Sequence, residues 1–175
     1  MTEVIIAGFG GQGILSMGRL IAYAGLLEDK NVSWLPSYGP EMRGGTANCG
    51  VVVSDELVSS PILNSCNALI VMNGPSLDKF ESYVVPGGVI IADSSLVNRE
   101  LHRTDISLIK IPATVLANEA GNKTYAGIIL LGALIGKTQI VSEGSFEKAL
   151  KGVLPKKKHY MIPEEMDMLK KGMNY

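Results

Sequence analysis

Short apolar runs rich in Val, Ile and Leu alternate along the chain with longer segments whose apolar residues recur at helical spacing. The runs predict strands at residues 4–7, 32–35, 47–54, 68–73, 88–93 and 108–111. The longer segments predict helices at residues 14–27, 76–83, 113–120, 124–137 and 146–153. Strands that alternate with helices are typical of an α/β fold in which helices cover both faces of a mostly parallel sheet. We therefore expect a three-layer α/β sandwich.

The third predicted strand breaks the parallel pattern. Its last residues, Val53-Ser54, meet Asp55-Glu56, and a second apolar pair, Leu57-Val58, follows at once. Two apolar runs separated by a two-residue polar turn predict a tight antiparallel hairpin. The sheet should therefore be mixed, with a mostly parallel body and one antiparallel hairpin.

The end of the chain differs from the rest in composition. Ser145 is the predicted N-cap of the helix at 146–153. Lys156-Lys157-Lys158 then predicts a solvated linker, and Pro163 occupies the first position of a short final helix. We expect residues 1–154 to form the α/β domain. Residues 155–175 should form a basic linker and a helix that packs on the domain or on a partner.

Composition and charge exclude several classes of protein. A length of 175 residues fits one domain, and a formal net charge of -1 leaves no electrostatic footprint for nucleic acid or an anionic membrane. Cys49 and Cys66 are far apart and form no C-x-x-C pair, which argues against an iron–sulfur cluster, a zinc site or a disulfide framework. The chain also lacks a signal-peptide pattern and a bilayer-length apolar run. These features predict a cytoplasmic protein with buried thiols.

A glycine motif follows the first strand and opens the first helix. Its residues are Gly8, Gly10, Gly11, Gln12 and Gly13. This strand–turn–helix order is that of a Rossmann-like unit, in which backbone N–H groups at the helix N-terminus can hold an anion. The alternative is that the glycines serve only the close packing of helix on strand. The second strand lacks the terminal Asp or Glu that would hold a ribose, which argues against bound NAD.

A long loop leaves the end of the second strand, the edge at which ligands bind in open α/β sheets. It carries Tyr38, Glu41, Arg43, Gly44 and Gly45. Arg43 is suited to a phosphate or carboxylate, and Glu41 is close enough to orient it. The alternatives for Arg43 are an ion pair with Glu41 or a contact to a partner chain. For the aromatic Tyr38, stacking on a base competes with a place in the core or an interface.

The remaining residues supply no catalytic set. His102 and His159 lie in polar segments with no nucleophile nearby. Asp93-Ser94-Ser95 follows a strand, where an N-cap and turn is the favoured interpretation. No His, Cys and carboxylate residues stand at metal-ligand spacing. We predict neither a catalytic residue nor a metal site in this chain.

Taken together, the two glycine-rich segments resemble the γ subunit, or γ domain, of 2-oxoacid:ferredoxin oxidoreductases. The matching segments run from Gly8 to Ile14 and from Ser37 to Cys49. Further matching features lie at residues 60–61, 72–77, 111–113 and 131–133. The loop that begins at Trp34 looks most like the 2-oxoglutarate type, followed by the 2-oxoisovalerate type. One departure is Gly127, where the resemblance implies Asn.

The resemblance implies an enzyme complex that converts a 2-oxoacid, coenzyme A (CoA) and oxidised ferredoxin into an acyl-CoA, carbon dioxide and reduced ferredoxin. It also implies that thiamine diphosphate, magnesium and iron–sulfur clusters lie in companion α, β and ferredoxin-like δ subunits. This chain would then contribute assembly and part of the CoA-access site, through its two glycine-rich segments. The alternatives are a purely structural scaffold and a free-standing nucleotide-binding protein. Isolated, the chain is expected to be inactive and to be capable of forming a homodimer.

Overall fold

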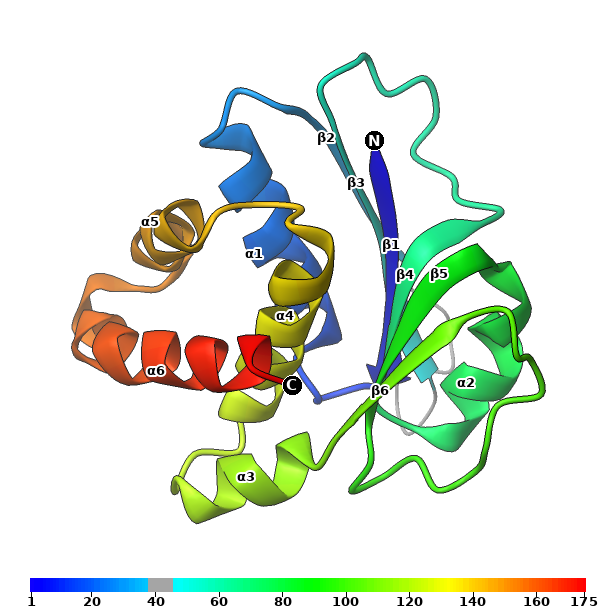
Figure 1. Cartoon of the computed structure of the whole chain (residues 1–175). Coiled ribbons are helices and arrows are strands. Elements are labelled where there is room, and N and C mark those ends of the chain that lie inside the picture. Colours follow the sequence, from blue (N-terminus) through cyan, green and yellow to red (C-terminus); the bar gives the residue numbers. More distant parts are fainter. Residues whose placement is uncertain (38–45) are drawn as a thin grey trace.

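The computed structural model describes residues 1–37 and 46–175, and it is a mixed sheet covered by helices on both faces (Figure 1). The elements in chain order are β1 (Thr2–Phe9), α1 (Ile14–Leu26), β2 (Asn31–Ser37), β3 (Thr46–Ser54), β4 (Cys66–Val71), α2 (Gly74–Phe80), the 3-10 helix η2 (Glu81–Tyr83), β5 (Val84–Asp93), β6 (Ser107–Ile111), α3 (Ala113–Glu119), α4 (Tyr125–Thr138), α5 (Glu143–Val153), the 3-10 helix η3 (Lys156–Met161) and α6 (Ile162–Met173). All six predicted strands are present, and the predicted α/β class is confirmed.

The strand order in the sheet is β2-β3-β1-β4-β5-β6. The strands β1, β4, β5 and β6 are parallel to one another, whereas β3 lies between β1 and β2 and is antiparallel to both. The mixed sheet is confirmed, but the hairpin at Asp55-Glu56 is wrong. Both edges of β3 are already paired, so Leu57 finds no strand to extend and is 87% exposed.

The sheet separates two apolar clusters, because alternate residues of a strand point to opposite faces. On one face, Val4 and Ile6 of β1 pack with α1 and α4. On the other face, Ile5 and Ala7 pack with α2. Figure 1 shows α5 and α6 outside α1 and α4, so this side carries two layers of helix. The double cover explains why α4 is buried from Tyr125 to Ile135.

The backbones of α4 and α6 approach each other closely at glycines. A Cβ atom built on Gly132 would overlap the carbonyl group of Leu169, and one on Gly172 would overlap the carbonyl group of Ile129. Only glycine leaves room for this contact. The crossing therefore depends on these two residues, and it fixes α6 against the main body of the protein.

Helix termini correct two of the predictions. The N-cap of α5 is Ser142, whose side chain accepts a hydrogen bond from the N–H of Ser145, so Ser145 is not the cap. Either serine fits the sequence pattern, and the extended backbone at Ser142 decides between them. The final helix begins at Ile162, which puts Pro163 one position later than predicted. The segment expected as a linker forms η3, with its three lysines exposed.

Glu28, which follows α1, is hydrogen-bonded to Ser142, the N-cap of α5. Its Oε1 atom accepts a hydrogen bond of 2.6 Å from the N–H of Ser142, and its Oε2 atom lies 3.0 Å from Lys30 Nζ. Burial alone would raise the pKa of Glu28, but these hydrogen bonds outweigh burial and lower the pKa to about 2. The ionised carboxylate therefore stabilises the folded chain.

We expect Glu28→Gln to lower the free energy of unfolding at pH 7 by about 2 kcal/mol. The folded-state pKa of Glu28 lies below its unfolded value, so the contribution is complete above about pH 4.5 and is lost as the pH falls towards 2. Urea unfolding of both proteins at pH 7 and pH 3 measures this. The difference in unfolding free energy between the two proteins should be smaller at pH 3 than at pH 7. An equal difference at both pH values would contradict the role of the charge.

Candidate ligand site at the glycine turn

Both predicted glycine-rich segments begin at the same end of the sheet, where β1 and β2 end. In the register of the strands, Phe9 at the end of β1 faces Thr46 at the start of β3, and Ser37 at the end of β2 faces Asn48. This confirms that the loop after β2 starts at the same end of the sheet as residues 8–13, which we call the glycine turn, with β3 between them. The predicted site residues of that loop lie outside the described residues; they are Tyr38, Glu41, Arg43, Gly44 and Gly45.

The glycine turn lies at the switch point of the sheet. The neighbouring strands β1 and β4 are parallel, but α1 after β1 packs on one face and α2 after β4 packs on the other. Ligands bind in the crevice that such a divergence opens at the carboxyl ends of the strands. The neighbour of β1 on its other side is β3, not β2. The end of β2 therefore does not stand where a dinucleotide fold places its ribose-binding carboxylate.

The glycines of the turn serve two different purposes. Gly11 and Gly13 have φ angles of 90° and 77°, and no atom lies within 4 Å of where their Cβ atoms would be. They are required for the backbone conformation. At Gly8 a Cβ atom would lie 2.6 Å from Gln12 Oε1 and 2.8 Å from Ile14 Cδ1, so this glycine is required for packing. The packing interpretation holds at Gly8, whereas anion binding by the turn stays a prediction.

Gln12 closes the turn with its side chain. Its Oε1 atom accepts a hydrogen bond of 2.6 Å from the N–H of Phe9, and its Nε2 atom donates one of 3.2 Å to the carbonyl of Met72. The amide thus ties the turn to the end of β4. Gln12 therefore positions the glycine turn; it also lines the adjoining pocket, and its contact with a ligand stays a prediction.

The N-terminus of α1 has no side-chain cap. Its N-cap is Gly13, which makes no side-chain hydrogen bond, and the first turn contains no acidic residue. The first N–H groups of a helix lack partners within the helix and carry partial positive charge, which favours an anion. The helix runs for 13 residues, long enough for its dipole to contribute. Anion binding is the chemistry that this end of the site supports.

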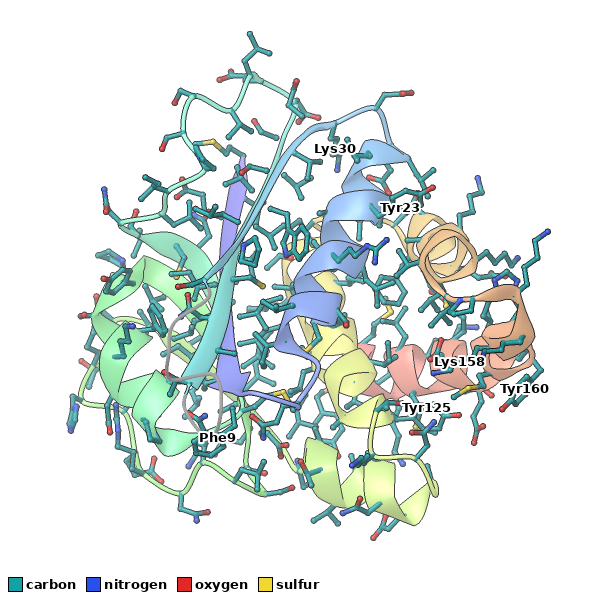
Figure 2. All side chains as sticks on the ribbon, turned by 180° about the vertical axis from the view of Figure 1, so that it is seen from behind. Phe9, Tyr23, Lys30, Tyr125, Lys158 and Tyr160 are labelled. Atoms are coloured by element: carbon teal, nitrogen blue, oxygen red, sulfur yellow. The ribbon has the colours of Figure 1, made fainter. Side chains whose placement is uncertain are left out.

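A pocket of about 420 Å³ adjoins the glycine turn, and we call it the α1–α6 pocket. Its wall comes from α1, the start of α4, η3 and α6; it includes Met17, Leu20, Gly127, Leu154, Met161 and Glu165. Two exposed lysines, Lys123 and Lys158, also contact the pocket. In Figure 2, Lys158 extends from η3 on the same side of the molecule as Tyr125 at the start of α4. The size fits a small-molecule site.

Two residues of the pocket differ from expectation: Glu165 was not predicted as a site residue, and Gly127 stands where the family resemblance implied Asn. Glu165 was missed, although Ile162, Glu165, Met166 and Leu169 share one buried face of α6. A carboxylate within an apolar helical stripe was the signal that could have found it. A Cβ atom on Gly127 would lie 3.0 Å from Met17 Sδ, so the Asn that the resemblance implied would have to displace Met17.

The other candidate polar groups have structural roles. Asp93 is fully buried and accepts hydrogen bonds from the N–H of Ser95 at 3.1 Å and from the N–H and Oγ1 of Thr114 at 3.2 and 2.5 Å. It joins the end of β5 to the start of α3, which confirms the turn; the N-cap is wrong, because no helix begins at residues 93–95 and the N-cap of α3 is Pro112. Burial raises the pKa of Cys49 and of Cys66 to about 12, so both thiols stay protonated.

Two features are absent from the described residues. No group of three or more His, Cys, Asp or Glu side chains in residues 1–37 and 46–175 could hold a metal ion. Among the same residues, no helix is both long and apolar enough to pass through a membrane.

Comparison with known proteins places this fold among redox enzymes of one family. The family model described as pyruvate ferredoxin/flavodoxin oxidoreductase matches residues 3–175. The chain is 42% identical over 151 residues to ketoisovalerate oxidoreductase subunit VorA of Methanothermobacter thermautotrophicus, covering 85% of this chain and 31% of that protein. It is 38% identical over 157 residues to 2-oxoglutarate synthase subunit KorC of Methanocaldococcus jannaschii, covering 88% of this chain and 84% of that protein. The chain thus spans about a third of the length of the ketoisovalerate relatives.

Solved structures share the whole architecture. The γ subunit of a keto/oxoacid ferredoxin oxidoreductase from Geobacter sulfurreducens superposes with a TM-score of 0.84 at 28% identity, over 99% of both chains. A 2-oxoglutarate:ferredoxin oxidoreductase from Magnetococcus marinus, solved with 2-oxoglutarate, CoA and succinyl-CoA bound, superposes with a TM-score of 0.88 at 23% identity, over 99% of this chain and 30% of that one. The second likeness concerns the fold alone.

Proposed function

Since the chain belongs to the pyruvate ferredoxin/flavodoxin oxidoreductase family, we propose that it is the γ component of a 2-oxoacid:ferredoxin oxidoreductase. The observation that carries this proposal is the agreement of the whole chain with the γ subunit from Geobacter sulfurreducens. The complex would form an acyl-CoA and carbon dioxide from a 2-oxoacid and CoA, and would reduce ferredoxin. We propose 2-oxoglutarate as the substrate and 2-oxoisovalerate as the alternative, because relatives of both types share 38 to 42% identity with the chain.

The redox cofactors are proposed to lie in companion α, β and δ subunits. The described residues do not fit an iron–sulfur cluster, because Cys49 and Cys66 are buried and stay protonated, whereas a cluster needs thiolates. The two unpaired thiols support a cytoplasmic location.

Two functions are proposed for the chain itself, assembly and part of the CoA-access site. The open N–H groups at the start of α1 would bind the diphosphate of CoA, and Arg43 from the neighbouring loop would add its charge. What supports this role is the uncapped N-terminus of α1 beside the α1–α6 pocket. No residue of this chain is proposed to act on the reacting atoms.

We expect Arg43→Ala in the reconstituted complex to raise the apparent KM for CoA about tenfold, because one charged contact with a phosphate is lost. The kcat at saturating CoA should stay nearly unchanged. Steady-state kinetics with varied CoA measures this. Lys137→Ala, which removes an exposed cation in the last turn of α4, is the matched control. An unchanged KM in a fully assembled complex removes Arg43 from CoA binding.

The scaffold alternative makes a different prediction for the same loop. If the loop only contacts companion subunits, substitutions at Tyr38, Glu41 and Arg43 abolish co-purification of those subunits and leave the KM for CoA of any remaining complex unchanged. Intact assembly with a weakened response to CoA supports the ligand site instead. Saturable micromolar binding of NAD or FAD to the isolated chain would favour the free-standing nucleotide-binding protein.

Native purification tests the proposed γ role as a whole. The chain should co-elute with larger subunits that carry thiamine diphosphate and iron–sulfur clusters, and the fraction should reduce ferredoxin with 2-oxoglutarate or 2-oxoisovalerate in the presence of CoA. Rates with each 2-oxoacid decide the substrate. An active enzyme composed of this polypeptide alone would overturn the proposal.

A further inference from the structure

A carboxyl group without a hydrogen-bond partner lies in the wall of the α1–α6 pocket. Glu165 is 5% exposed, and its Oε2 atom has no hydrogen-bond partner among the described residues. Burial raises the pKa of Glu165, and the charge of Lys158 opposes this only in part. Buried polar groups are nearly always hydrogen-bonded, since leaving one unpaired costs free energy. The Oε2 atom has less than 1 Å² of accessible surface, so a ligand in the pocket would pair with it once the carboxyl group turns towards the pocket, and this hydrogen-bonding capacity is unused within the described residues.

The neighbouring residue explains why Glu165 is held in this position. Glu164 accepts a hydrogen bond of 2.6 Å from the hydroxyl of Tyr125, a buried residue at the start of α4. This bond fixes the first turn of α6 against α4. Because adjacent helical residues point about 100° apart, Glu165 is then turned towards the pocket. The carboxyl group is thus held by the packing of two helices.

The two regions of the pocket differ in chemistry. The region that includes Glu165 has apolar side chains, Leu150, Leu154 and Met161, and the charge of Lys158 also acts on the carboxyl group there. The other region consists of the glycine turn at the uncapped N-terminus of α1, and the exposed Lys123 borders the same pocket. An occupant should therefore combine a flat, apolar group that offers hydrogen bonds with an anionic group.

A protonated carboxyl group offers one donor and one acceptor side by side, as a side-chain amide does. Amides pair in this way with the edge of adenine, which has an amino donor next to a ring-nitrogen acceptor. The phosphates of an adenine nucleotide match the open N–H groups at the start of α1. An adenine nucleotide therefore has both of the features that the pocket requires.

We propose that the α1–α6 pocket binds an adenine nucleotide, with Glu165 paired to the amino group and ring nitrogen of the base and the phosphates at the glycine turn. The nucleotide can be the nucleotide half of CoA or a free adenine nucleotide. The first source rests on the proposed function, because it uses the CoA of that reaction. The second source would make the pocket a regulatory site.

Isothermal titration of the full chain with ADP tests the pocket directly. Glu165→Leu should weaken ADP binding about tenfold or more, the loss of paired hydrogen bonds to a buried base, whereas Glu165→Gln should keep binding within a few-fold. The matched control is Asp167→Leu, which changes an exposed carboxylate on the same helix. Purine riboside diphosphate, which lacks the amino group, should bind the unchanged chain about tenfold more weakly than ADP. Circular dichroism confirms that each variant is folded.

Three results would overturn the proposal: no binding of ADP at millimolar concentration, equal binding of ADP and purine riboside diphosphate, or full binding by folded Glu165→Leu. Competition by CoA then identifies the source. If CoA displaces ADP and Glu165→Leu weakens both, the pocket holds the nucleotide half of CoA. If ADP binds selectively and CoA does not compete, the pocket holds a free nucleotide, and only the proposed CoA role fails. A chain that co-purifies with its companion subunits but binds no nucleotide overturns the pocket proposal alone.

Discussion

Replacing Gly172 by alanine is expected to lower the free energy of unfolding by about 3 kcal/mol or more, the upper range for overpacking a close contact. The added Cβ atom would overlap the carbonyl group of Ile129 on α4, and backbone cannot move aside as a flexible side chain can. The helices α4 and α6 would have to separate along their crossing. Urea unfolding followed by circular dichroism measures the change.

Two further variants sharpen this test. Gly144→Ala adds the same methyl group to a helical glycine with no atom within 4 Å, and it should leave stability unchanged or slightly improved. Gly132→Ala should destabilise as strongly as Gly172→Ala, because it meets α6 at Leu169. The double variant should lose less than the sum, since either change already opens the same crossing. A loss below about 1 kcal/mol for Gly172→Ala would contradict the close contact.

Replacing Glu81 by alanine is expected to cost about 3 to 5 kcal/mol, the range for removing one partner of a buried ion pair. Glu81 is 4% exposed. Its carboxylate accepts hydrogen bonds of 2.7 Å from Arg99 Nη2 and of 2.6 Å from the N–H of His102. The guanidinium of Arg103 donates to the carbonyl groups of Glu81 and Val84. Glu81→Ala removes the side-chain anchors of the segment between β5 and β6, whereas the bonds from Arg103 to the backbone carbonyls remain.

The effect of Glu81 should depend on pH. Burial alone would raise the pKa of Glu81, but hydrogen bonds from Arg99 and from the N–H of His102 outweigh burial and lower it. A folded-state pKa below the unfolded value means that the carboxylate stabilises the protein above the ordinary pKa of Glu and that this contribution is lost as the pH falls. Glu81→Ala and the unchanged chain should therefore approach each other in stability as the solution is acidified.

A surface ion pair provides the control. Glu147 and Lys151 lie one turn apart on α5, 2.8 Å between Oε1 and Nζ, with both side chains largely exposed. Exposed pairs of this kind contribute little, so Glu147→Ala should leave stability nearly unchanged at every pH. A loss for Glu81→Ala no larger than that for Glu147→Ala would show that the buried network does not hold the segment.

The elements of this protein were predictable because each strand and helix follows from local patterning. Residues 4–7 are apolar on both faces, as a central strand requires, and the strand β1 forms there. The hairpin at Asp55-Glu56 failed because strand pairing is not local. The sequence does show a turn after β3, but it does not show that β1 and β2 already occupy both edges of that strand.

The candidate site was predicted in part. The glycine turn lies where the pattern placed it, yet Gln12 proved to hold the turn together, because its side chain reaches Met72, 60 residues away. Glu165 was missed for a related reason. Its segment carries both acidic and apolar residues, and only the packing of α6 on α4 decides that this carboxyl group faces a pocket instead of water.

The sequence by itself determined the α/β class, the positions of the strands and most helices, and the turn that exposes backbone amides beside β1. These features depend on apolar periodicity and on glycine conformation, which act over a few residues. Tertiary structure alone decided the insertion of β3 between β1 and β2, the glycine crossing of α4 and α6, and the pocket with its unpaired carboxyl group. Each of these depends on which distant surfaces meet, and that is settled by the packing of the whole chain.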